Sequence, residues 1–196
     1  MKSLIFGLSL LLLLSCNMNN ETRDKHGGHE TETSAVERPE EGYNPEAKLE
    51  ELGITLNTPS PPVANYVNAV RTGNLIFLAG KGPRMTSGEY ITGKVGAGLT
   101  IEEGYAAARL TGINQLSVLK AELGNLNKVK RIVKVKGMVN AAPDFTDHPK
   151  VVNGYSDLMV EIFGDRGKHA RAAVGMGSLP TNIAVEIDMV VEVYED

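Results

Sequence analysis

The amino-acid sequence predicts one two-layer α+β domain over residues 47–196, in which two helices cover one face of a mixed β-sheet. Two stretches place apolar residues at helical spacing, and the segments around them have the short or alternating apolar pattern of strands. These elements follow one another in the order β-β-α-β-α-β-β. Strands before, between and after two helices indicate helices set apart on one side of the sheet. About 150 residues are enough for a single hydrophobic core.

The first two strands are expected at residues 66–71 and 74–79, which flank a short Thr-Gly turn. The first helix is expected to follow Thr100, because Thr100 and Glu103 have the spacing of a capping box, and to end at Gly124. Its apolar positions recur at helical spacing: Ala106, Leu110, Ile113, Leu116, Leu119 and Leu123.

The second half of the domain is expected to contain a strand, a helix and two further strands. Lysines and valines alternate over residues 128–136, which predicts a half-buried strand with a solvated lysine face. An RNA-binding groove is the alternative, but no aromatic side chains are interleaved with the lysines. The second helix is expected to begin near Pro149 and to end at Gly164. The last strands are expected at about residues 169–177 and 182–194.

Residues 1–16 have the features of a secretory signal, with Lys2 followed by an apolar run from Leu4 to Leu14. That run is shorter than the roughly 20 residues that a transmembrane helix needs. The stretch Leu13-Leu14-Ser15-Cys16 resembles the lipobox of bacterial lipoproteins, in which the cysteine is acylated. The resemblance implies a membrane lipid anchor on Cys16 and a place in the bacterial cell envelope, on the periplasmic side or at the outer membrane. A cleaved signal peptide with an incidental cysteine is the alternative.

Residues 17–46 are expected to be a disordered acidic tether, because they hold eight acidic and three basic side chains and few large apolar ones. His26 and His29 within it raise the hypothesis of a zinc or copper site, but no third ligand is held in place, which favours a polar linker. No metal or organic cofactor is expected. Residues 47–196 contain 16 basic and 16 acidic side chains, and this neutrality argues against a nucleic-acid partner.

Arg171 and Glu186 are the candidate site residues of the last two strands. A hairpin turning through residues 178–181 is expected to place Arg171 opposite or diagonal to Glu186. A surface salt bridge is the alternative interpretation, and it would contribute less than about 1 kcal/mol. Small residues around Arg171 leave room for a ligand. The outward face of the last strand mixes acidic residues with Val190, so a partner is expected to cover it.

Four stretches between residues 52 and 193 carry a family pattern: "NYVNAVRTGNLIFLAG", "EEGYAAARLTGINQLSVLKAELGNL", "VKGMVNAAPDFTDHPKVVNGYSDL" and "HARAAVGMGSLPTNIAVEID". They resemble the RidA family, also called YjgF or endoribonuclease L-PSP, in its chorismate-mutase-like branch. The resemblance implies the same strand order. It also implies homotrimers whose three sheets close into a barrel with clefts between subunits.

The best understood members of this family hydrolyse 2-imino or enamino acids to 2-oxo acids and ammonia. The resemblance implies that Arg171 binds the substrate carboxylate and that Glu186 orients or deprotonates the attacking water. A planar guanidinium and a carboxylate suit these roles. The resemblance also implies substrate contacts from Tyr66, Gly80 and Asn153. Packing, turn and helix-end roles are the alternatives for these three.

Three positions depart from the family pattern. Many deaminating members have Ser-Gly-Gln where this chain has Ala79-Gly80-Lys81, and a cysteine where it has Ala173. Three functions remain open: an imine or enamine deaminase, a non-catalytic trimer that binds a small carboxylate, and, as the weakest, an endoribonuclease. The first requires Arg171 and Glu186, the second requires Arg171 alone, and the third requires a basic surface that the neutral domain lacks.

Overall fold

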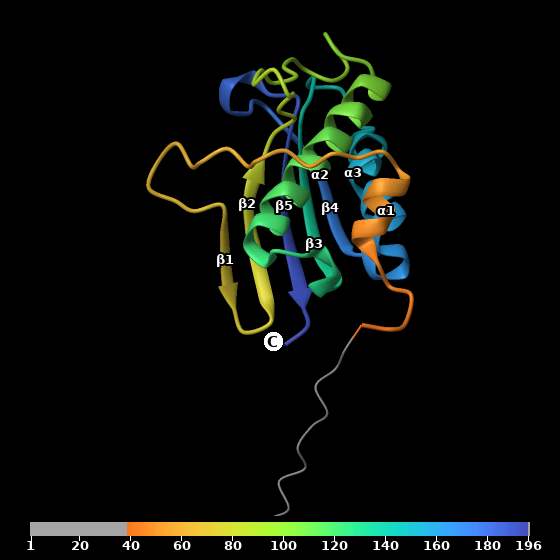
Figure 1. Ribbon diagram of the computed structural model, residues 1–196. Helices are drawn as coiled ribbons and strands as arrows, with labels where there is room; N and C mark the ends of the chain where they lie inside the picture. The colour runs from red at the N-terminus through yellow and green to blue at the C-terminus, as the bar shows by residue number, and fades with distance from the viewer. Residues whose placement is uncertain (1–38, 196) are drawn as a thin grey trace, which may run out of the picture. The chain divides into compact units, whose positions relative to one another are not determined.

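The structure, a computed structural model, describes residues 39–195. The helices are α1 (Pro45–Glu51), α2 (Ile101–Leu123) and α3 (His148–Phe163), and the strands are β1 (Ala69–Thr72), β2 (Leu75–Lys81), β3 (Val129–Asn140), β4 (Ala170–Met176) and β5 (Val185–Val193). Short 3-10 turns occupy Leu126–Lys128, Gly164–Gly167 and Pro180–Asn182. The strands form one five-stranded sheet in the order β1-β2-β5-β3-β4, and α2 and α3 cover one of its faces (Figure 1). This architecture confirms the predicted α+β fold.

The helix boundaries follow the local signals in the sequence. The Thr100 hydroxyl accepts a hydrogen bond from the Glu103 amide at 3.1 Å, and the Glu103 carboxylate accepts one from the Thr100 amide at 2.8 Å. This is the predicted capping box. Gly124, with φ of 74°, ends α2, and Gly164, with φ of 58°, ends α3. Both glycines adopt left-handed backbone conformations that other residues rarely adopt.

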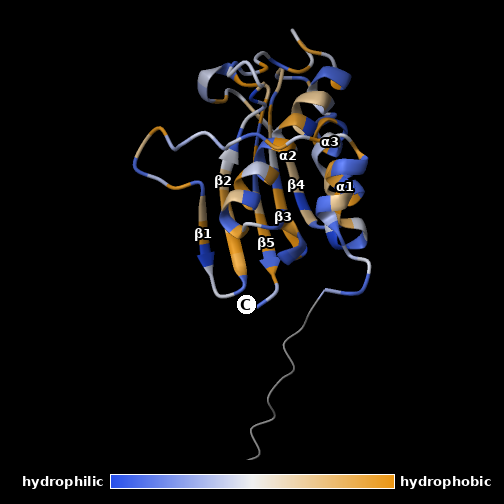
Figure 2. Ribbon diagram, in the orientation of Figure 1, coloured by the Kyte–Doolittle hydropathy of each residue, from blue (hydrophilic) through white to orange (hydrophobic). Residues whose placement is uncertain are grey.

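The hydrophobic core lies between the sheet and its two covering helices. Alternate residues of β5 are at most 2% exposed, and the apolar side chains of α2 and α3 pack over them. Figure 2 shows the apolar residues concentrated along the central strands. The main members are Ile76, Leu116, Leu119, Ile132, Tyr155, Leu158, Ile187 and Met189. Burial of this surface is the main favourable contribution to folding.

The predicted hairpin between the last two strands is wrong. β4 runs parallel to β3, with Arg171 beside Val135, whereas β5 pairs with the other edge of β3, with Glu186 beside Met138. The turn Pro180–Asn182 therefore carries the chain past the end of β3. The alternating apolar residues of β5 fit a central strand that packs under both helices. The small residues of β4 occupy the sheet edge.

β3 is longer than expected and less regular. It reaches Asn140, and its pairing with β5 shifts register twice near its start. Because each shift changes which side chains point inward, Ile132 is buried in the core while Val133 is only half-buried. Lys134 and Lys136 are exposed, as the strand pattern predicts.

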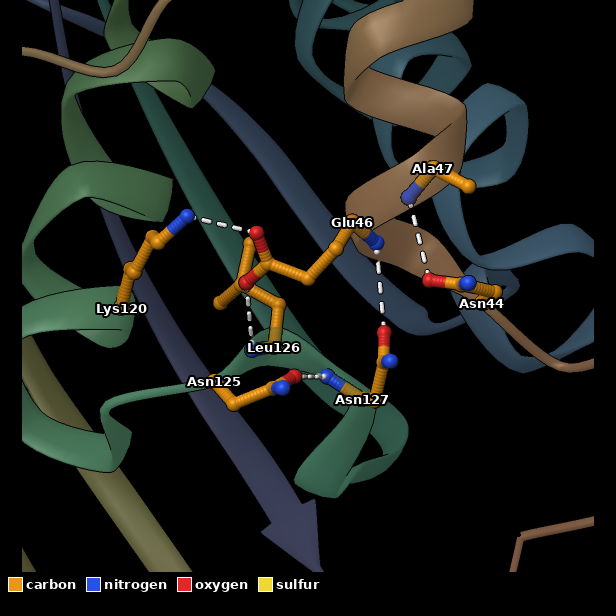
Figure 3. A network of polar contacts seen from close by, with 7 residues as sticks. All are labelled: Asn44, Glu46, Ala47, Lys120, Asn125, Leu126 and Asn127. Carbon is orange, nitrogen blue, oxygen red and sulfur yellow. Dashed lines mark hydrogen bonds and ion pairs between the residues drawn. The ribbon is translucent and has the colours of Figure 1, made fainter.

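α1 is fastened to the junction between α2 and β3 by a network around Glu46 (Figure 3). One carboxylate oxygen of Glu46 accepts a hydrogen bond from the Leu126 amide at 2.9 Å, and the other pairs with Lys120 Nζ at 2.5 Å. The Asn127 side chain accepts a hydrogen bond from the Glu46 amide at 3.2 Å. The side chain of Asn44 caps α1, because its Oδ1 accepts a hydrogen bond from the Ala47 amide at 3.0 Å.

The last residues of the expected tether lie against the domain. The Tyr43 hydroxyl donates to the Val129 carbonyl at 2.7 Å, so the contacts begin before residue 47. The expected signal, Cys16 and the two tether histidines lie outside the described residues. Within residues 39–195, no helix combines the length and the apolar character needed to span a bilayer.

Candidate functional site

The predicted site residues fall into separate groups on the two faces of the sheet. Arg171 pairs with the buried Val135 and therefore points to the helix-covered face. Glu186 pairs with Met138 and alternates with the buried Val185 and Ile187, so it points to the open face. One chain therefore does not bring Arg171 and Glu186 together.

Arg171 is held by the side chains of α3. Its Nη1 donates to Asn153 Oδ1 at 2.8 Å and to Ser156 Oγ at 3.0 Å. Asn153 was predicted as a site residue, whereas Ser156, one helical turn further on, was missed. Arg171 is exposed, and no carboxylate within residues 39–195 pairs with it. Its guanidinium is therefore free to bind an anion from outside the chain.

His169 extends this hydrogen-bonded chain. Its Nδ1 lies 2.6 Å from the Gly167 carbonyl and its Nε2 lies 3.1 Å from Ser156 Oγ. A carbonyl only accepts, so Nδ1 carries the proton and Nε2 accepts from the Ser156 hydroxyl. Burial lowers the pKa of His169; the carbonyl of Gly167 opposes this shift, and the charge of Arg171 adds to it. The position of His169, two residues before Arg171, was its only signal in the sequence.

Glu186 and Gly80, two further predicted residues, lie in contact on the open face. A Cβ added to Gly80 would collide with Glu186 Oε1, so a larger residue at position 80 would displace this carboxylate from its present position. Burial raises the pKa of Glu186, the neighbouring Asp188 raises it further, and Lys136 opposes the shift. A half-buried carboxylate with a raised pKa is suited to accepting and returning a proton near neutral pH.

A bulge in β2 sets the position of Gly80. Leu78 pairs with Met189 and Lys81 pairs with Ile187, so two residues of β2 lie opposite one residue of β5. The fully buried Gln115 of α2 donates from Nε2 to the Ala79 carbonyl at 3.0 Å and to the Ile187 carbonyl at 2.7 Å. Sequence reasoning missed Gln115, because nothing in its helical pattern shows that it meets a bulge.

Tyr66 lies apart from both groups. It is 47% exposed and belongs to the segment that leads into β1. Because β1 and β4 are the two edge strands, Tyr66 and Arg171 lie at opposite sides of the sheet within one chain. No hydrogen bond within residues 39–195 joins Tyr66 to any other predicted site residue.

The family model described as "YjgF/chorismate_mutase-like, putative endoribonuclease" matches residues 46–193. The chain belongs to the YjgF/RidA family. The chain is 44% identical to Protein TCP17 of Trypanosoma cruzi over 147 residues, which are 74% of this chain and 92% of that protein. It is 29% identical to the 2-iminobutanoate/2-iminopropanoate deaminase of Dermatophagoides farinae over 131 residues, 66% of this chain and 87% of that protein.

The crystal structure of the protein Atu1372 of Agrobacterium tumefaciens, whose function is unknown, has a TM-score of 0.71 and 43% identity. The match covers 76% of this chain and 92% of that one. This YjgF/RidA chain therefore shares its fold with the Atu1372 protein. In the described part of the chain, no three His, Cys, Asp or Glu side chains converge as metal ligands. The two groups of site residues offer an arginine, a carboxylate and their hydrogen-bond partners.

Proposed function

We propose that this YjgF/RidA protein hydrolyses reactive 2-imino or enamino acids to 2-oxo acids and ammonia, in clefts between the subunits of a trimer. The observation that carries the proposal is the pair of Arg171, which has no carboxylate partner in residues 39–195, and Glu186, whose pKa is raised. They lie on opposite faces of one sheet, so a cleft that contains both needs a second chain. The relative named as an imine deaminase supports the same chemistry.

In the proposed reaction, the substrate carboxylate binds the guanidinium of Arg171, which Asn153 and Ser156 hold in place. Glu186 of a neighbouring subunit takes a proton from a water molecule as its oxygen attacks the carbon of the C=N bond. Glu186 then returns the proton to the nitrogen, which gives a carbinolamine. In the second stage Glu186 takes the hydroxyl proton and passes it to the nitrogen while the C=O bond forms and the C–N bond breaks, so that ammonia and the 2-oxo acid leave. A carboxyl pKa closer to neutral favours these proton transfers.

A non-catalytic trimer that binds a small carboxylate is the second candidate. Ala79 and Ala173 favour it, because they supply neither the hydroxyl nor the thiol that many deaminating members of the family carry at these positions. Arg171 would bind the carboxylate in the same way, and Glu186 would have no role in turnover.

The test measures ammonia release from freshly generated 2-iminobutanoate, together with binding of 2-oxobutanoate by calorimetry. Arg171→Ala is expected to abolish both, and Arg171→Lys to restore little, because an ammonium lacks the planar fork. Glu186→Gln is expected to bind normally and to turn over on the order of 100-fold more slowly. Binding without turnover in the wild type would favour the second candidate. Normal binding by Arg171→Ala would contradict both.

The location of the protein is part of the proposal. The lipobox-like stretch ending at Cys16 supports a lipid anchor in the bacterial cell envelope, because two or more acyl chains give stable membrane attachment. Cys16→Ser is expected to move the protein out of the membrane fraction or to block its processing. Unchanged fractionation of this variant would argue against the anchor.

A further inference from the structure

A cavity of about 220 Å³ lies beside the end of β2, and its lining shares no residue with the Arg171 or Glu186 groups. Its walls come from three places: residues 57–60 in the segment that crosses from α1 to β1, residues 81–90 at and after the end of β2, and residues 114–118 of α2. Lys81 alternates with Gly80, which faces the open side of the sheet, so Lys81 points to the helix-covered side.

Lys81 supplies a half-buried positive charge to this cavity. Its ammonium donates one hydrogen bond, to Asn68 Oδ1 at 2.6 Å, and an ammonium has three donors. Burial lowers the pKa of Lys81, and no carboxylate within residues 39–195 pairs with it. A desolvated cation without a counter-charge is costly. Lys81 also stands where many deaminating members of the family have glutamine.

Arg84 supplies the second positive charge. Its Nε donates to the Gly88 carbonyl at 3.2 Å, which fixes the side chain and leaves the terminal nitrogens of the guanidinium for other partners. Asn114 of α2 donates to the carbonyls of Gly82 and Arg84, each at 3.1 Å, and so holds the backbone that carries Arg84. Arg84 likewise has no carboxylate partner in the part of the chain that the structure describes.

The rest of the lining mixes polar residues with a few apolar ones and contains no acidic side chain. Four of its residues carry hydroxyls that have no hydrogen-bond partner within residues 39–195: Thr58, Ser60, Thr86 and Tyr90. Two cations and these hydroxyls around one small cavity form a site for an anion that carries more than one charge.

We propose that this cavity binds a small phosphate-type oxyanion between Lys81 and Arg84. A phosphate dianion matches two positive charges, whereas a carboxylate would leave one uncompensated. The cavity also has room for a small organic group attached to the phosphate, so both free phosphate and a phosphate monoester fit the chemistry. A bound anion would connect the segment around residues 57–60 to the sheet and to α2.

The experiment is calorimetric titration of the full chain with inorganic phosphate at low ionic strength, for the wild type, Lys81→Gln and Arg84→Gln. The wild type is expected to bind one phosphate per chain. Each substitution is expected to weaken binding at least about tenfold, because each removes a charge-assisted contact. Lys48→Gln is the matched control, since it removes one positive charge at an exposed salt bridge on α1, and it is expected to bind normally.

Further titrations distinguish free phosphate from a phosphate monoester, and binding in this cavity from binding at Arg171. Glycerol phosphate binding more tightly than phosphate would identify a monoester as the ligand class, and equal affinity would identify the free ion. Arg171→Ala is expected to leave phosphate binding unchanged; loss of binding there would place the anion at the other site and overturn the proposal. Equal affinity in Lys81→Gln and the wild type would also overturn it. Thermal unfolding checks that each variant is folded, and the two variants test the cavity independently.

Discussion

Gly80 shows how closely single residues define the candidate site. Gly80→Ala would place a Cβ too close to Glu186 Oε1, so the carboxylate must move from its present position. We expect imine hydrolysis to fall about as far as in Glu186→Gln, while the midpoint of thermal unfolding changes little. Gly98→Ala is the matched control, because a Cβ at Gly98 meets no atom within 4 Å. Wild-type turnover by Gly80→Ala would show that the position of Glu186 is unimportant.

His169 is expected to make the stability of the domain depend on pH. Burial lowers its folded pKa below the unfolded value of about 6.5, so the unfolded chain binds this proton first on acidification. The contribution of neutral His169 to the free energy of unfolding is therefore fully present above about pH 6.5. It is lost as the pH falls through the lowered folded pKa. Urea unfolding from pH 8 to 5 measures it. His169→Gln is expected to flatten this part of the profile, and identical profiles would contradict the buried, neutral imidazole.

The sequence predicts some residues of the candidate site and misses others for a physical reason. The family resemblance selected Arg171, Asn153, Gly80 and Glu186 without pairing them, and the structure places Asn153 in contact with Arg171 and Gly80 in contact with Glu186. Ser156 and Gln115 were missed because their roles depend on tertiary neighbours. A serine on a helix and a glutamine in an apolar helix face have many uses, and only the packing of that helix on the sheet selects one.

At the scale of the elements, hydrogen bonds from Gln115 of α2 stabilise the bulge in β2. Gln115→Leu would leave the half-buried Ala79 carbonyl and the buried Ile187 carbonyl without their shared donor. It would also remove Gln115 Oε1, a buried oxygen without a hydrogen-bond partner in the described residues. We expect the free energy of unfolding to fall by about 1–2 kcal/mol, since an unsatisfied buried polar group costs about 1–3 kcal/mol and the loss of Oε1 offsets part of this cost. Turnover is expected to fall as well, because the bulge places Gly80. Glu122→Ala, on the exposed side of the same helix, is expected to change neither, and chemical denaturation distinguishes the two variants.

Local signals predicted the elements but not how the last strands pair. The capping box at Thr100 and the glycines that end both long helices act within a few residues, so they are visible in the sequence. The pairing of β4 and β5 is decided by distant contacts. Every second residue of β5 is buried, so β5 is most stable at the centre of the sheet, under the helices. β4 pairs in parallel with the other side of β3. A short connection therefore suggested a hairpin that the packing does not allow.

At the scale of the molecule, the open face of the sheet carries an apolar row that the helices do not cover. Val70 pairs with Phe77 and Phe77 pairs with Val190, on three adjacent strands. Val70 is 54% exposed and Phe77 is 46% exposed. Exposed apolar side chains that lie next to one another on a folded domain are typical of a surface that a partner covers. Glu186 lies on the same face, so covering it with other chains would also enclose the carboxylate.

The trimer that we propose is tested by placing a charge in this row. Phe77→Glu is expected to give folded monomers, because the side chain points away from the core while a buried carboxylate between subunits is costly. Imine hydrolysis is expected to disappear with the trimer, since Arg171 of one chain would no longer meet Glu186 of another. Leu52→Glu adds the same charge at a residue that is 37% exposed beside α1, and it is expected to stay trimeric and active. Light scattering at micromolar concentration measures the mass. A monomeric wild type that still hydrolyses imines, or a trimeric and active Phe77→Glu, would show that the open face is not the interface on which the site depends.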